Sequence, residues 1–341
     1  MAVDALHPPT GVEPEVPGPS SSSARHAVLV VAALAAVGVA LRLADPAGSA
    51  WLQNLLIVLS SLLVEALPFI LLGALASAAI EVFVPSSAFA RIARLPRPLQ
   101  LPAAAVAGVA FPVCECGSVP VARRLVAKGL APGAAVTFML AAPILNPVVV
   151  ASTFVAYRGR DSLWTMVLGR MGLGLLVAIA VGWVVGNARK EELLRPRSDD
   201  EHDTEANEPR WRRFFGHLSG DFVFMAAFLV MGAAIAAAVQ TFVPQSVIGG
   251  VAGTPVLDLV AMMALAFVLS LCSESDAFVA ASFVQFGPAA QLAFLVFGPM
   301  VDMKLGALYV GTYSRGFFRT VVIAVSAVTL AGTLWIKVVA G

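Results

Sequence analysis

The chain has 341 residues, of which 59% are hydrophobic and 13% are charged, and its formal net charge is +1. A soluble domain carries roughly a quarter of its residues as Asp, Glu, Lys and Arg, so most of this surface must face something other than water. The charge balance excludes a basic field for nucleic acid, and the three cysteines are too few for a disulfide scaffold. The composition therefore predicts an all-α, polytopic membrane protein.

The N-terminal residues 1–26 are rich in Pro, Ser and Gly and have no apolar periodicity, which predicts a disordered tail. An extra first transmembrane helix is expected over 27–50. The apolar run within it also has the length of a signal peptide, and Gly48-Ser49-Ala50 is similar to a cleavage site. The long acidic and Pro-rich leader favours a retained helix over a cleaved signal.

A series of apolar segments continues to the C-terminus. A membrane span needs about 20 apolar residues, and two of the segments, 101–114 and 256–272, are short for that. The full set is 27–43, 53–82, 101–114, 132–156, 162–186, 219–243, 256–272, 289–313 and 317–340. The hydrophilic stretch 187–216 predicts a charged loop between two membrane halves, 51–186 and 217–341.

The two halves resemble each other. GALASAAIEVFVP, from Gly73 to Pro85, aligns with GAAIAAAVQTFVP, from Gly232 to Pro244. A second alignment places matching residues of the two halves at one constant offset, and its pairs are Cys116 with Cys272, Pro132 with Pro288, Phe138 with Phe294, Pro143 with Pro299, and Asn146 with Asp302. Because several matching residues occur in the same order in both halves, the sequence predicts an internal repeat.

The basic residues predict how the halves are oriented. Lys and Arg near helix ends favour the cytoplasmic side, which places the 187–216 loop and the N-terminus in the cytoplasm. The basic clusters of 91–97 and 123–128 can both lie inside only if 101–122 is a re-entrant hairpin. The corresponding hairpin, about 254–287, lies in a stretch without Lys or Arg and would open to the outside. Opposite charge bias in related halves is typical of an inverted-topology repeat.

The tip of the first hairpin carries two cysteines. It reads Phe111-Pro-Val-Cys-Glu-Cys-Gly-Ser-Val-Pro120, with Glu115 between Cys114 and Cys116 and with Ser118 two residues further on. In an extended backbone both sulfurs would face one side, where they could bind a soft metal ion. The alternative is that both cysteines only pack as small apolar side chains.

The second hairpin tip is acidic. It reads Leu271-Cys-Ser-Glu-Ser-Asp-Ala277 and offers Cys272, Glu274 and Asp276. Carboxylates within membrane segments are costly and indicate an ion or substrate path, so a protonatable Glu274 would couple transport to protons. The alternative is a tip that merely reaches the outer interface.

Two apolar segments contain helix-breaking residues at matching places. The first break contains Pro143, Asn146 and Pro147, and the second offers Asp302 and Lys304. Proline removes a backbone hydrogen bond and frees carbonyl groups that can contact a substrate, so the two breaks predict a midplane site. The alternative is a kinked helix whose Lys304 reaches the surface.

Other sequence features limit the kinds of functional site that this protein is expected to contain. Arg170 is a basic residue within a span and is expected to pair with Glu65 or Glu81. The sequence has no nucleotide-binding P-loop motif, and its four histidines fall in stretches read as tails or loops. No cofactor, no buried histidine metal centre and no enzymatic activity are therefore predicted.

Three motifs carry a family resemblance: CECGSVPVARRL, KGLAPGAAVTFMLAAPILNP and FGPMVDMKL. They resemble the predicted-permease family that includes the ArsP-type permeases, over a stretch from about Leu55 to the C-terminus. The resemblance implies a permease of the bacterial inner membrane without its own ATPase, and ArsP-type members are linked to efflux of trivalent organoarsenicals. It also implies functional roles for Cys114, Cys116, Pro143, Asn146, Pro147, Glu274 and Asp302.

The leading hypothesis is a secondary permease that exports a small thiophilic solute, such as a trivalent (organo)arsenical or a soft metal species. The expected partners are the lipid bilayer, the solute or metalloid, and protons; no nucleic acid is expected, and a homo-oligomer is compatible with the sequence. One alternative is a membrane thiol oxidoreductase that carries electrons across the bilayer. Another is a channel, or a membrane subunit energised by a separate ATPase.

Overall fold

The computed structural model describes residues 49–85, 96–110, 113–186, 193–195, 209–242 and 256–340. The contacts divide the chain into two units, Met1–Gln53 and Asn54–Gly341, and nearly all of the described residues belong to the second unit. The predicted tail 1–26, all but the last two residues of the predicted helix 27–50, and most of the charged loop 187–216 lie outside the described residues.

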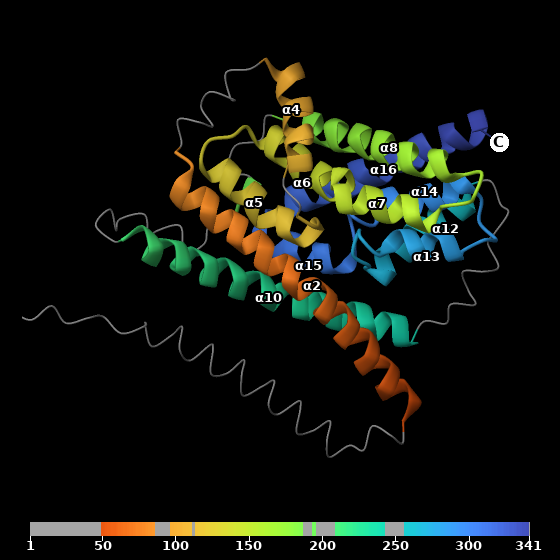
Figure 1. The fold of residues 1–341 in the computed structure, drawn as a ribbon, viewed down its shortest axis with the longest axis horizontal. Coiled ribbons are helices and arrows are strands. Elements are labelled where there is room, and N and C mark those ends of the chain that lie inside the picture. Colours follow the sequence, from red (N-terminus) through yellow and green to blue (C-terminus); the bar gives the residue numbers. More distant parts are fainter. Residues whose placement is uncertain are drawn as a thin grey trace, which may run out of the picture. The chain divides into compact units, whose positions relative to one another are not determined.

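The described ranges fold as helices, which Figure 1 follows along the chain. The helices of the first half are α2 (Ala50–Phe83), α4 (Arg97–Ala110), α5 (Glu115–Ala127), α6 (Pro132–Leu145), α7 (Pro147–Ala156) and α8 (Leu163–Val185). Those of the second half are α10 (Arg210–Phe242), α12 (Leu257–Leu269), α13 (Asp276–Ser282), α14 (Pro288–Phe297), α15 (Met303–Thr312) and α16 (Arg315–Ala340). A single isolated β-bridge among these residues joins Leu194 to Tyr313.

Five helical stretches in the described part of the chain are long and apolar enough to cross a membrane. They are Ala50–Phe83, Pro132–Ala156, Leu163–Val185, Arg210–Phe242 and Arg315–Val339. Large apolar side chains such as Trp183 and Trp335 are exposed on them, as expected for surfaces that face lipid. The protein is therefore an all-α, polytopic membrane protein, as its composition predicts.

The start of α10 corrects the sequence analysis. The helix begins at Arg210 and includes His217, which was expected in a loop. The hydrophilic stretch of the sequence extends beyond the loop because charged residues such as Arg212 and Arg213 occupy the first turn of α10. The predicted loop 187–216 is thus too long at its C-terminal end.

Both predicted helix breaks are present. α6 ends at Leu145 and α7 begins at Pro147, where the proline ring occupies the first helical position and lacks only a donor that a helix start leaves unused. The Asn146 side chain accepts a hydrogen bond from the Val148 N–H at 2.9 Å and so caps α7. In the second half, α14 ends at Phe297, and Asp302 caps α15 by accepting from the Leu305 N–H at 2.7 Å.

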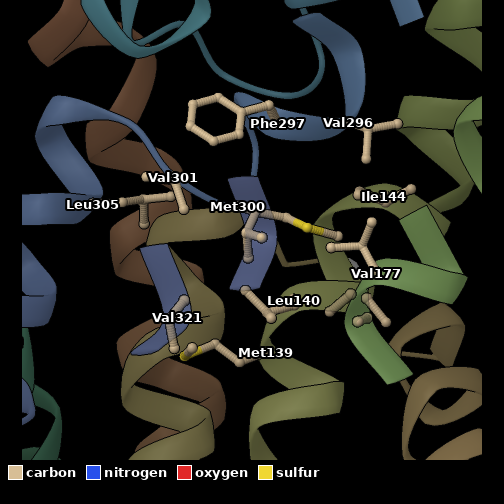
Figure 2. Close-up of a cluster of buried hydrophobic side chains, with 14 of the residues drawn as sticks. Met139, Leu140, Ile144, Val177, Val296, Phe297, Met300, Val301, Leu305 and Val321 are labelled. Atoms are coloured by element: carbon tan, nitrogen blue, oxygen red, sulfur yellow. The ribbon is translucent and has the colours of Figure 1, made fainter. Parts of the chain in front are cut away.

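The core lies around these breaks. α6 packs against α4, α5 and α8, while α14 packs against α8, α12 and α16. Figure 2 shows Met300, from the turn between α14 and α15, in one cluster with apolar side chains of α6, α8, α14, α15 and α16. The irregular backbone of the second break is thereby enclosed by protein, the condition under which such backbone is tolerated at membrane depth.

Candidate functional site

The N-terminus of α5 meets the loop between α12 and α13. Ser270 ends α12 in a left-handed conformation, with φ of 48°, and the chain then turns through Cys272 to begin α13 at Asp276. The Ser273 hydroxyl donates to the Oε2 atom of Glu115 at 2.9 Å, and the Ser273 backbone N–H approaches the same oxygen at 3.4 Å. The two predicted hairpin tips are thus in direct contact, although they lie far apart in the sequence.

Three potential metal-ligand side chains converge at this contact. Glu115, Cys272 and Glu274 each offer one ligand atom, and the three atoms lie within 4.8 Å of one another. Glu115 and Cys272 are buried, and Glu274 is partly buried. We call these three residues the Glu115 group. Two carboxylates and one thiol within this distance can hold a positively charged or thiophilic ligand.

Several polar atoms in and beside this group have no hydrogen-bond partner. Among the described residues, Oε1 of Glu115, Oε1 of Glu274, Oδ2 of Asp302 and Nζ of Lys304 are all buried and unpaired. Buried polar atoms are nearly always hydrogen-bonded, so each exception calls for a physical reason. A polar ligand that enters the group would supply one.

Lys304 lies in the first turn of α15 and is 1% exposed, so its side chain does not reach the surface. Its ammonium group interacts electrostatically with Cys272, Asp302, Cys116 and Glu115. Lys304 therefore places a positive charge beside the acidic Glu115 group, and the alternative of a surface lysine is wrong. Its backbone is held closely, since a Cβ added at Gly232 of α10 would lie 2.8 Å from the Lys304 Cα.

α2 approaches the group from another side. Glu65 accepts a hydrogen bond of 2.6 Å from the Ser275 hydroxyl, which follows Glu274 in the α12–α13 loop. Further along, α2 crosses α5 where Gly73 meets Gly117, and a Cβ added at Gly73 would lie 2.3 Å from the Gly117 Cα. Glycine at both positions allows this backbone approach, which sets the distance between α2 and the start of α5.

Arg170 has a different partner from either expected one. Its guanidinium binds the Asp276 carboxylate at 2.7 Å and donates to the Ser273 carbonyl oxygen at 3.1 Å and the Thr153 hydroxyl at 2.9 Å. Arg170 is 1% exposed, and a buried cation needs such partners to offset its lost hydration. The expected pairing with Glu65 or Glu81 is therefore wrong, and Arg170 instead anchors the α12–α13 loop to α7 and α8.

The two cysteines of the first tip are not arranged as the sequence suggested. Cys114 is the extended residue before α5, with ψ of 178°, but Cys116 lies inside the first turn of the helix. Both are free and buried, as is Cys272. The backbone is therefore not extended through the tip, because the helix begins at Glu115, yet the Cys114 and Cys116 side chains still interact with each other. In the described part of the chain, the cysteine that joins a group of ligand atoms is Cys272.

The remaining predicted residues have local structural contacts. The Ser118 hydroxyl donates to the carbonyl oxygens of Glu115 and Met139 at 2.9 and 3.0 Å, which fixes the first turn of α5 on α6. Pro143 lies within α6, while Asn146 and Pro147 form the start of α7. Asp276 serves as the partner of Arg170, with its Oδ1 atom left unpaired.

Sequence reasoning did not assign to the site the side chains that hold the group in place: Glu65, Thr153, Ser273 and Ser275. The two serines alternate with Cys272, Glu274 and Asp276 in an otherwise apolar stretch, and that alternation was the available signal. Glu65 and Arg170 were visible as charges within spans, but their partners depend on how helices from both halves pack.

Comparison with known proteins identifies relatives over most of the chain. The model of a family described as "Predicted permease", ArsP_1, matches residues 51–338. The UPF0718 protein YcgR of Bacillus subtilis is 39% identical over 281 residues, which cover 81% of this chain and 95% of the relative. A Streptococcus mutans protein named "Putative two-component membrane permease complex subunit" is 34% identical over 261 residues, or 75% of this chain and 85% of the relative. No solved structure matches.

Proposed function

Because the chain belongs to the predicted-permease family whose model matches residues 51–338, we propose that it is a secondary permease that exports a small thiophilic solute. The solute class is a trivalent (organo)arsenical or a soft metal species. The observation that carries the proposal is the set of unpaired polar atoms around the Glu115 group, enclosed among helices long enough to span a membrane. Ionisable groups at such a place indicate a substrate path.

In this proposal the solute passes between the α5 N-terminus and the α12–α13 loop. Cys272 and Cys116 supply sulfur, Glu115 or Glu274 exchanges protons, and Asp302 lines the path with Lys304. The edges of the same path are formed by Cys114, Asn146 and Asp276. A buried thiol is a soft ligand, which favours thiophilic solutes over hard ions such as Mg²⁺.

The proposed architecture is a pair of inverted repeats with re-entrant hairpins. α5 of the first half packs against α15 of the second, and α13 of the second half packs against α7 of the first. In the sequence alignment α5 corresponds to α13 and α7 to α15, so exchanging the halves converts one contact into the other. This exchange supports a two-fold relation whose centre lies near the Glu115 group. The basic clusters then favour a plasma-membrane orientation with the 187–216 loop in the cytoplasm.

The name of the S. mutans relative favours a second candidate function, a subunit of a two-component permease. In that case the chain would form the membrane path only together with another protein. The two candidates differ in whether the purified chain transports by itself.

Transport by the purified full-length chain in proteoliposomes tests the proposal. We expect faster movement of methylarsenite, arsenite, Zn²⁺, Cd²⁺ or Cu⁺ than in protein-free liposomes, without nucleotide and with stimulation by an imposed pH gradient. Cys116→Ser and Glu115→Gln should slow transport, while Asp258→Asn, which changes an acid paired with the partly exposed Lys337, should not. Transport of none of these solutes by the chain alone, but recovery with a co-purified protein, would establish the two-component alternative.

Thiol trapping during turnover separates transport from electron transfer. A permease keeps all three cysteines as free thiols, as they are in the structure. A free-thiol count that changes with the redox conditions would favour a thiol oxidoreductase instead.

A further inference from the structure

We propose that Glu115, Cys272 and Glu274 form a binding site for a borderline divalent cation of the Zn²⁺ or Cd²⁺ kind, and that Lys304 is a tethered positive charge that competes with it. The inference rests on the proposed function and narrows its solute class. It depends on the donor set of the group, its geometry, its unpaired atoms and the position of the lysine.

The donor set favours a divalent metal over arsenic(III). The Glu115 group contains one thiol and two carboxylates. Thiolates dominate the binding of the softest species, whereas Zn²⁺ accepts sulfur and carboxylate oxygen together. The group by itself offers one sulfur where a trivalent arsenical prefers two or three, so arsenic(III) would also need the neighbouring Cys116. A divalent cation such as Zn²⁺ can bind the one thiol and the two carboxylates of the group together.

The geometry is close to what such a cation needs. Zn²⁺ binds sulfur at about 2.3 Å and carboxylate oxygen at about 2.0–2.2 Å, so ligand atoms on a tetrahedral ion lie roughly 3.5 Å apart. The three ligand atoms of the group lie within 4.8 Å of one another. Small rotations of the side chains therefore suffice, without movement of α5 or of the α12–α13 loop.

The unpaired atoms are an independent indication of a ligand. Glu115 is 1% exposed, and Ser273 engages its Oε2 atom at 2.9 Å while Oε1 has no partner. Oε1 of Glu274 is likewise unpaired. A carboxylate that is held by one oxygen and free at the other is the arrangement expected of a metal ligand oriented by a neighbouring hydrogen bond.

Lys304 determines how tightly the cation is held. Its buried ammonium group has no hydrogen-bond partner and interacts electrostatically with both Cys272 and Glu115. Without the cation, this charge offsets the negative charge of the group. With the cation bound, two positive charges share a poorly hydrated space and repel each other, which weakens binding. Asp302, two residues away at the start of the same helix, can then receive the ammonium group. A transporter needs this balance because its substrate must also leave.

Equilibrium dialysis and calorimetry of the detergent-solubilised full-length protein test the site with Zn²⁺, Cd²⁺ and Mg²⁺. We expect one Zn²⁺ or Cd²⁺ per chain, no saturable Mg²⁺ binding, and a sulfur-to-Cd²⁺ charge-transfer absorbance that Cys272→Ser removes. Glu115→Gln and Glu274→Gln should each weaken binding by at least about tenfold. Lys304→Met should strengthen binding, which no merely structural role of the lysine predicts.

Matched controls come from the ion pair of Asp258 with Lys337, whose atoms lie 2.6 Å apart. Asp258→Asn and Lys337→Met make the same charge changes outside the group and should leave binding unchanged. Gel filtration and thermal melting show which variants are folded, and Glu274→Gln provides a second ligand test if Glu115→Gln fails to fold.

The proposal is overturned if the wild type binds neither Zn²⁺ nor Cd²⁺, or if Lys304→Met weakens binding as the ligand variants do. Methylarsenite transport without metal binding would refute only this inference, whereas metal binding without any transport would refute only the permease proposal.

Discussion

The Glu115 group and a second cluster of charges, which also includes a residue of α5, differ in how completely their polar atoms are paired. In the second cluster, Arg124 of α5 lies 3.5 Å from both Glu81 of α2 and Asp221 of α10. Lys128 binds the Glu81 carboxylate and donates to the carbonyl oxygens of Glu81 and of Val84, which follows α2, while Ser77 donates to Asp221 at 2.7 Å. These residues, Ser77, Glu81, Arg124, Lys128 and Asp221, are called the Glu81 network.

None of the described side-chain atoms of the Glu81 network is both buried and unpaired, whereas Glu115, Glu274, Asp302 and Lys304 each have one such atom. Both clusters include a residue of α5, so the difference does not come from that helix. The Glu81 network pairs its charges across α2, α5 and α10, whereas the Glu115 group leaves carboxylate oxygens unpaired, the condition that the proposed ligand site requires.

The largest loss of stability is expected for a substitution in the Glu81 network. Arg124→Met removes the cation shared by Glu81 and Asp221 and leaves two largely buried carboxylates with fewer partners. Loss of one partner from a buried ion pair costs about 3–5 kcal/mol, so thermal unfolding in detergent should shift strongly to lower temperature. If Arg124→Met melts like the wild type, the network is not structural and the comparison fails.

The next effect concerns the crossing of α2 and α5, two helices that carry residues of the Glu81 network, with α5 also carrying Glu115. Gly73→Ala introduces a Cβ that would lie 2.3 Å from the Gly117 Cα, so the helices must separate. Overpacking of this kind costs roughly 1–3 kcal/mol, and we expect both stability and transport to fall. The matched control is Gly172→Ala in α8, where an added Cβ meets nothing within 4 Å. Equal behaviour of the two variants would show that the glycine contact has no role in positioning.

A third variant separates function from stability in the Glu115 group. Glu115→Gln preserves the size of the side chain and an oxygen for the Ser273 hydroxyl but removes a buried negative charge. Transport should fall at least about tenfold, because a ligand is lost, while the melting temperature stays close to that of the wild type. A strong loss of stability in this variant would place Glu115 with the paired, structural charges.

The smallest effect is expected at the Asp258 and Lys337 pair, where the lysine side chain is 31% exposed. Pairs near solvent contribute about 0–1 kcal/mol, so Lys337→Met should change the melting temperature only slightly. A shift as large as that of Arg124→Met would mean that burial does not distinguish the two pairs.

Much of the helical framework could be predicted from the sequence. The apolar segments match α2, α8 and α16 closely and the end of α10, and the prolines and capping residues at Asn146 and Asp302 indicated both breaks. These features are local: the length of an apolar run, the missing proline donor and a polar side chain at a helix start act within a few residues.

The candidate site was predictable in membership but not in arrangement. Glu115, Cys272, Glu274, Asp302 and Lys304 stood out as polar or soft residues in apolar surroundings, and the structure brings them near one another. The extended backbone expected at Cys114 and Cys116 was wrong, because the helix begins at Glu115, between the two cysteines. The partner of Arg170 was wrong because Asp276 reaches it from the other half of the chain.

The sequence by itself determined that this protein spans a membrane, where its helices break and which few polar or soft residues lie in apolar surroundings, since these depend on hydration and backbone geometry over short distances. Only the tertiary structure decided that Cys272 joins Glu115, that Arg170 anchors the α12–α13 loop, and that Lys304 is buried beside the acids. Such contacts join segments more than 100 residues apart in the chain, as the Ser273 to Glu115 bond does, so they depend on helix packing rather than on local pattern.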